Sequence, residues 1–158
     1  MVQIRPVVLT IGIVLCSVAA AMLLPAMVDY LDGRTGARVF LASSVLSFFV
    51  GGLMLLVALD DKPMQLGLKE GFVLTTVCWV FVAAFAALPF IGLGLSVSDA
   101  FFESMSGLTT TGATVLVKLD DLSRGILLWR SLLQGLGGLG IVVTALIILP
   151  FLRVGGMQ

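Results

Sequence analysis

Histidine is absent from the 158-residue sequence, and only two cysteines occur, Cys16 and Cys78. Without histidine, the chain lacks the commonest general base and the commonest zinc ligand. Two thiols inside apolar runs define no disulfide framework. The sequence also shows no nucleophile–base pair and no cluster of metal-ligating residues. It therefore predicts a protein that is not an enzyme and that has no resident cofactor.

Charged residues are scarce as well. They make up 11% of the chain, nine basic and nine acidic, so the formal net charge is zero. A soluble domain averages about 25% charged residues, whereas this chain is 59% hydrophobic with a mean hydropathy of +1.19. The balanced charge gives no footprint for nucleic acid. The composition therefore predicts an all-α, multi-pass membrane protein whose first partner is the lipid bilayer.

Four apolar runs are each long enough to cross the roughly 30 Å hydrocarbon core of a bilayer. These runs are residues 6–28, 39–59, 72–95 and 126–152. The first two would make residues 1–60 a pair of N-terminal transmembrane helices. A cleavable signal peptide is the rival interpretation of the first run, because Arg5 precedes it and "VAAA" resembles a cleavage site. The apolar run continues to Met27, which favours a span. Trp79 and Trp129 lie near span ends and fit interfacial anchors.

A shorter amphipathic segment, residues 99–108, precedes the last run. At about 1.5 Å per residue, a helix of this length covers roughly half of the hydrocarbon core. Ser98 and Asp99 are residue types that cap helices, and for Asp99 a capping role is favoured over a role as ion ligand. The segment is predicted to be a half-helix that enters the membrane and stops.

The sequence "TTTGAT", residues 109–114, follows this half-helix. Non-helical backbone at membrane depth is tolerated only where protein buries it or water reaches it. An extended segment of this composition can present carbonyl oxygens to a cation in place of its water shell. Glycine takes the backbone angles that this requires, and threonine adds a hydroxyl oxygen and a stiff side chain. We expect an extended, shielded segment that binds a monovalent cation. An ordinary re-entrant turn and a surface loop are the alternatives.

The stretches "DAFFESMSGLTTTGAT", "RSLLQGLGGLGIVVTALIILP" and "GGMQ" resemble the TrkH potassium-uptake subunits of the TrkH/TrkG/KtrB/HKT superfamily. The resemblance implies four consecutive span–pore-loop–span units around one pore, preceded by two additional helices. Residues 71–158 would be the first such M1-P-M2 unit of an N-terminal fragment. M1 would be residues 72–95, the pore helix 99–108, the filter 109–114 and M2 126–152.

The resemblance also implies roles for individual residues. Thr110, Thr111, Gly112 and Ala113 would line the pore and bind K⁺ as the transported substrate, with Thr114 at the outer edge. Glycine at position 112 is similar to the potassium-preferring pattern of the family. Further implied partners are the remaining pore units of the same polypeptide, a second copy in a homodimer and a TrkA-type cytoplasmic nucleotide-binding subunit. The implied location is the bacterial inner membrane.

The last run contains Arg130 and Gln134, one helical turn apart. An arginine at this depth is costly and faces protein or water unless it reaches the interface. We expect either such an interfacial position or an ion pair with Glu103, which would support the filter from behind. The motif "GLGGLG" matches a dinucleotide-binding pattern, but its flanks are membrane spans rather than a strand and a helix. Close helix packing is the favoured interpretation.

Two other functions stay open at this stage. A non-transporting membrane scaffold or assembly protein is one, and a fragment of a sodium-permeable cation channel is the other. Asp120 and Asp121 follow the threonine segment and are expected either to attract cations weakly at the pore mouth or to be part of a solvated loop.

Overall fold

The computed structural model describes residues 4–59, 68–117 and 122–153, with side chains described within 4–59, 71–117 and 122–146. All regular structure in these ranges is helical, which confirms the predicted all-α fold. The helices are α1 (Ile4–Ala21), α2 (Leu23–Leu31), α3 (Gly36–Ala58), α4 (Leu68–Ala86), α5 (Leu88–Gly92), α6 (Val97–Leu108) and α7 (Arg124–Arg153).

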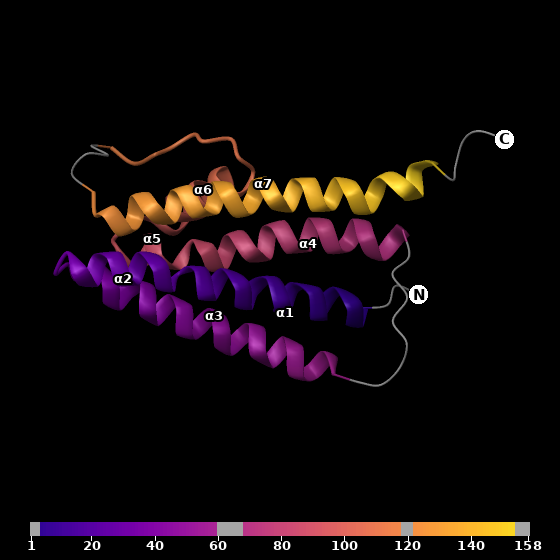
Figure 1. Ribbon diagram of the computed structural model, residues 1–158, viewed down its shortest axis with the longest axis horizontal. Helices are drawn as coiled ribbons and strands as arrows, with labels where there is room; N and C mark the ends of the chain where they lie inside the picture. Colours follow the sequence, from indigo (N-terminus) through magenta and orange to yellow (C-terminus); the bar gives the residue numbers. More distant parts are fainter. Residues whose placement is uncertain (1–3, 60–67, 118–121, 154–158) are drawn as a thin grey trace.

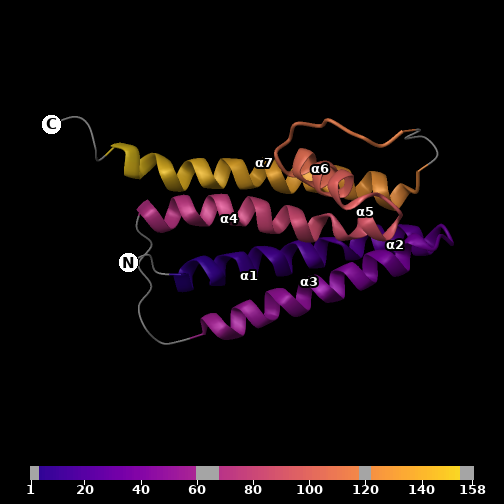
Figure 2. The same cartoon turned by 180° about the vertical axis from the view of Figure 1, so that it is seen from behind.

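Four segments of the described chain are long and apolar enough to cross a membrane. They are Ile4–Leu31, Gly36–Ala58, Gly71–Gly92 and Arg124–Leu146. Figure 1 shows them as long rods that run side by side, with successive rods in opposite directions. The short helix α6 lies against the first half of α7 and is seen in front of it in Figure 2. The chain is thus an integral membrane protein with one short helix packed beside its spans.

Proline explains two breaks within the spans. The first span divides into α1 and α2 at Met22, three residues before Pro25, and the third divides at Ala87, just before Pro89. A proline ring clashes with the carbonyl four residues earlier and has no N–H to donate. Helical hydrogen bonds nevertheless continue across both breaks, for example from the Ala87 N–H to the Ala83 carbonyl at 3.0 Å. Each pair of helices therefore forms one continuous span.

Residues 29–38 separate the first two apolar runs of the sequence, but only part of this segment is a turn. Helix α2 continues to Leu31, and α3 already begins at Gly36. Asp29 is fully buried, and its carboxylate accepts hydrogen bonds from the Ser123 hydroxyl at 3.1 Å and from the Gly125 N–H at 2.9 Å. Gly125 lies in the first turn of α7, so Asp29 caps a helix that starts about a hundred residues later. This contact fixes the N-terminal helical hairpin, which consists of α1, α2 and α3, to the start of α7.

The prediction that Trp129 is an interfacial anchor is wrong. Its side chain is fully buried, and its indole N–H donates to the Ala86 carbonyl at 3.1 Å. The rings of Trp129 and Phe40 form a T-shaped pair, with 6.2 Å between the ring centroids. The position near the start of a span is compatible with either role, but α3 and α4 cover this face of α7. Trp79 is half-buried and lines a cavity described below.

Candidate functional site

Helix α6 begins earlier than the sequence suggests. The cap is Ser96, whose hydroxyl oxygen accepts a hydrogen bond from the Asp99 N–H at 3.2 Å. The same hydroxyl donates to the Asp99 carboxylate at 2.7 Å. Neither Ser98 nor Asp99 is therefore the capping residue, although Asp99 completes the cap from the first turn. The helix ends at Leu108, and the segment with three threonines starts there.

The main chain turns sharply at the end of α6. Four consecutive N–H groups bond back to carbonyls of the last turn of the helix. These bonds are Thr109 to Met105 at 2.9 Å, Thr110 to Gly107 at 3.0 Å, and Thr111 and Gly112 to Ser106 at 3.0 and 3.3 Å. Thr110 and Gly112 have positive φ angles of 58° and 75°. Such angles are strained for threonine and easy for glycine, and strain of this kind is typical of functional sites. Residues 111–117 then continue without regular secondary structure.

The carbonyl oxygens of this segment are not equivalent. Those of Thr110, Thr111 and Gly112 accept no hydrogen bond from any residue that the structure describes. The Ala113 carbonyl differs, because the Ser106 hydroxyl donates to it at 2.6 Å. Ala113 is thus the one of the four predicted pore-lining residues whose main-chain oxygen already has a partner. The predicted site residues lie together on one loop, and three of the four predicted pore-lining residues have free carbonyls.

Glu103 supports the far end of the loop from behind. It is 2% exposed and lies on the face of α6 toward α7. Its carboxylate accepts hydrogen bonds from the Thr114 hydroxyl at 2.9 and 3.0 Å and from the Val115 N–H at 3.1 Å. The Arg130 Nε lies 2.6 Å from the same carboxylate. Of the two positions expected for Arg130, the structure shows the ion pair with Glu103 and not a side chain extended to the membrane interface.

Helix α7 contacts the loop and α6 through small residues. A Cβ atom added to Gly137 would overlap the carbonyl group of Leu108, and one added to Gly107 would lie 3.0 Å from the Leu133 side chain. A Cβ on Gly112 would lie 3.3 Å from the Gln134 side-chain nitrogen. "GLGGLG" lies inside the continuous helix α7, so it is not a dinucleotide-binding loop. Its glycines allow α7 to approach the end of α6 closely.

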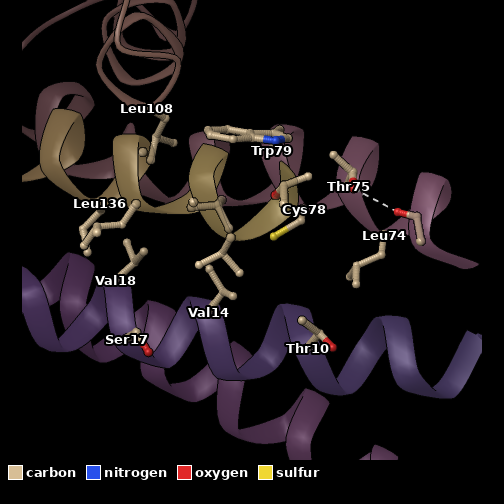
Figure 3. Close-up of a pocket in the computed structure, with 17 residues that line it drawn as sticks. Thr10, Val14, Ser17, Val18, Leu74, Thr75, Cys78, Trp79, Leu108 and Leu136 are labelled. Carbon is tan, nitrogen blue, oxygen red and sulfur yellow. Dashed lines mark hydrogen bonds between the residues drawn. The ribbon is translucent and has the colours of Figure 1, made fainter. Parts of the chain in front are cut away.

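An apolar cavity of about 350 Å³ lies between α1, α4 and α7, with Trp79 and Leu108 in its lining (Figure 3). The hydroxyls of Thr10, Ser17 and Thr75 line it too, but each donates to a carbonyl of its own helix. The dashed line in Figure 3 marks this bond for Thr75. Because these hydroxyls are engaged and the remaining lining is mainly apolar, the cavity does not resemble a cation site.

The loop faces outward in this chain. Residues 109–115 are all exposed, whereas the sequence led us to expect a shielded segment. The loop runs along the outer side of the α6–α7 layer, and no described element covers it (Figure 2). Asp120 and Asp121, expected near a pore mouth, lie outside the described residues. Sequence reasoning missed Ser106 and Asp29, because each acts through a contact with a residue that the local pattern does not identify.

The chain is similar to proteins of one family over nearly its whole length. Residues 36–158 match the family TrkH, described as "Cation transport protein". The Trk system potassium uptake protein TrkI of Halomonas elongata is 40% identical, over 97% of this chain and 31% of its own length. For TrkH of Salmonella typhimurium, the identity is 39% over 98% of this chain and 32% of the relative.

A solved structure agrees with these similarities. The crystal structure of the potassium transporter TrkH from Vibrio parahaemolyticus has a TM-score of 0.88 and 38% identity, covering 99% of this chain and 34% of that one. The chain thus spans about a third of the length of the relatives it matches. The family match over residues 36–158 and the identities of about 40% to TrkI and TrkH show that the chain belongs to the TrkH family of cation transport proteins.

Proposed function

We propose that the chain supplies the first of four selectivity-filter segments of a potassium-uptake protein. In this proposal α4 and α5 form M1, α6 is the pore helix, residues 109–114 are the filter and α7 is M2. Potassium is the transported substrate, and its ligands are drawn from the oxygens of the predicted filter residues 110–114, first among them the free carbonyls of Thr110, Thr111 and Gly112. The relatives are named potassium uptake proteins, which does not favour a non-transporting scaffold.

The observation that carries the proposal is the row of three unbonded carbonyls at Thr110, Thr111 and Gly112. Their depth matters. Gly112 lies beside Gln134, ten residues into α7, which corresponds to about 15 Å along the helix axis. That is near the middle of a hydrocarbon core of about 30 Å. An unsatisfied carbonyl costs several kcal/mol in such surroundings. Three adjacent ones are accounted for if a cation or the water of a pore meets them.

The electrostatics of the site also support a monovalent cation. No charged side chain occurs among residues 109–114. The Glu103 carboxylate, which accepts a hydrogen bond from Thr114 of the loop, is paired with Arg130. An ion therefore meets dipoles and no net charge, so it can bind without being trapped.

The outward face of the loop has a natural explanation in this proposal. Further pore units of the same polypeptide would face the loop across the pore and enclose it. The proposed setting is the bacterial inner membrane, with a homodimeric assembly and a TrkA-type cytoplasmic nucleotide-binding subunit as partners. The exposed apolar side chains of α3, such as Val45 and Phe49, are suited to contact with lipid or with another membrane segment.

The test is potassium uptake by the complete gene product in a bacterial host that cannot grow on low potassium. We expect the wild-type gene to restore growth and K⁺ uptake. Gly112→Ser should reduce the preference for K⁺ over Na⁺, because serine is strained at a φ of 75° and its side chain meets the Gln134 amide. A protein that is present in the membrane but moves no K⁺ would contradict the proposal. Equal uptake of Na⁺ and K⁺ by the wild type would favour a sodium-permeable channel instead.

A further inference from the structure

Ser106 has an unusual hydrogen-bonding partner for a serine inside a helix. Serine and threonine hydroxyls in helices commonly donate to the carbonyl four residues earlier. Ser104, Ser131 and Thr75 do so in this chain. The Ser106 hydroxyl instead reaches seven residues forward and donates to the Ala113 carbonyl at 2.6 Å. Ser106 itself is 5% exposed, so the donor of this bond is buried, whereas the acceptor residue Ala113 is exposed.

The same residue also holds the loop by its main chain. The Ser106 carbonyl accepts the N–H groups of Thr111 and Gly112, at 3.0 and 3.3 Å. Three consecutive loop residues are thus bonded to one residue of α6. The N–H groups of Thr111 and Gly112 point toward α6, whereas in Ala113 the carbonyl points toward α6. The hydroxyl therefore engages the carbonyl that directly follows the free carbonyls of Thr110, Thr111 and Gly112.

Glu103 holds the next residue of the loop. It lies one helical turn before Ser106 and accepts the hydrogen bond of the Thr114 hydroxyl. Residues three apart share a face of a helix, so one face of α6 fixes Ala113 and Thr114 side by side. The peptide group between these two residues is therefore held at its oxygen by Ser106 and at the following side chain by Glu103.

We infer that Ser106 is a specificity-determining positioning residue, which turns the Ala113 carbonyl away from the ion path and so leaves only three of the four predicted pore-lining residues, Thr110, Thr111 and Gly112, with a free carbonyl. This inference rests on the proposed function. Loss of the hydroxyl releases a fourth carbonyl that can turn toward the ion. The set of oxygen ligands is then larger and less fixed, and it adapts more readily to the smaller Na⁺ ion.

The variant that tests the inference is Ser106→Ala, with Ser104→Ala as its matched control. Both serines are buried on α6, and both changes remove one hydroxyl, but the Ser104 hydroxyl bonds only to the Ala100 carbonyl of its own helix. Ser106→Thr is the conservative variant, because it retains a hydroxyl at the same place. K⁺ and Na⁺ uptake are measured for the complete gene product in proteoliposomes, together with the amount of protein incorporated.

We expect Ser106→Ala to lower the ratio of K⁺ to Na⁺ uptake about fivefold, the equilibrium equivalent of one neutral hydrogen bond. Ser104→Ala should leave the ratio unchanged, and Ser106→Thr should restore most of it. If the wild type and Ser104→Ala select K⁺ and Ser106→Ala selects it equally well, the inference is overturned while the proposed function stands. If the wild type transports neither ion, the proposed function fails and the inference fails with it.

Discussion

Replacing Gly137 by alanine places a methyl group where α7 contacts the end of α6. The added Cβ would overlap the carbonyl of Leu108 and lie only 2.8 Å from the Leu108 Cα. Ordinary contacts between carbon atoms are about 3.5–4.0 Å. Leu108 is the last residue of the helix that leads into the loop, so the conflict involves main chain and no flexible side chain can relieve it. Either α7 or the end of α6 has to move by about 1 Å.

The magnitude follows from two opposing effects. Overpacking of a well-packed interior costs about 1–3 kcal/mol, and a clash with main chain is expected near 3 kcal/mol. Alanine favours a helix over glycine by about 1 kcal/mol, which offsets part of that cost. We therefore expect Gly137→Ala to destabilise the protein by about 2 kcal/mol. Gly135→Ala is the control, because no described atom lies within 4 Å of its added Cβ. It should be neutral or slightly stabilising.

The assay is thermal unfolding of the complete gene product in detergent, followed by K⁺ uptake of the same preparations. Gly137→Ala should lower the apparent melting temperature and the uptake, since the end of α6 also positions Thr110. Gly135→Ala should change neither property. The reasoning is refuted if Gly137→Ala is as stable as the wild type, or if both variants lose stability equally. In the second case, glycine at these positions would matter for the helix as such, and contact with Leu108 would not be the cause.

Two further predictions concern buried carboxylates. Glu103→Gln and Arg130→Gln should each impair uptake. The effect of Arg130→Gln should be more severe, because it leaves the Glu103 carboxylate, whose side chain has no exposed surface, without its ion-pair partner. Glu103→Gln leaves only the Arg130 side chain without a partner, and that side chain is 20% exposed. Breaking a buried ion pair costs about 3–5 kcal/mol of stability, so the abundance of each protein is measured together with its uptake. Equal uptake by the wild type and both variants would contradict the role of this pair in supporting the loop. Asp29→Ala should lower the stability by about 1 kcal/mol through loss of the cap on α7, as measured by thermal unfolding. Asp32→Asn, which affects only a surface ion pair with Arg124 at 3.7 Å, should have little effect, and equal losses in both variants would argue against the cap.

Much of the fold follows from the sequence because the spans depend on local composition. A continuous apolar run of more than twenty residues has few alternatives to a transmembrane helix. The half-helix was recognisable because residues 99–108 are too few to cross the membrane. The pair of Glu103 and Arg130 is one of two alternatives that the sequence leaves open for Arg130, because few other charges occur within the membrane-spanning part. Such charges need a partner at that depth.

The contacts that the sequence does not reveal join residues whose local patterns look ordinary. Asp29 follows an apolar run and resembles the first residue of a polar turn, yet it is buried against α7, 96 residues away from Gly125. Trp129 has the position of an interfacial anchor, but it is fully buried and contacts Phe40 of α3 and Ala86 of α4. The partner of the Ser106 hydroxyl depends on the turn at Thr110 and Gly112. No local periodicity encodes these distances, which arise from how the helices are packed.

The Glu103–Arg130 ion pair and the Ser106 hydroxyl, which lie behind the loop, can be explained by one physical requirement. A loop that binds a partly dehydrated cation needs oxygens that are fixed in place but carry no net charge, because a free carboxylate in a medium of low dielectric would hold the ion too strongly. Glu103 provides fixation through the Thr114 hydroxyl and the Val115 N–H, and Arg130 cancels its charge at 2.6 Å. Ser106 adds a neutral hydrogen bond at the adjacent residue. The support behind the loop is therefore electrically neutral as a unit, and in the proposed function the free carbonyl dipoles in front of it would determine which ion is bound.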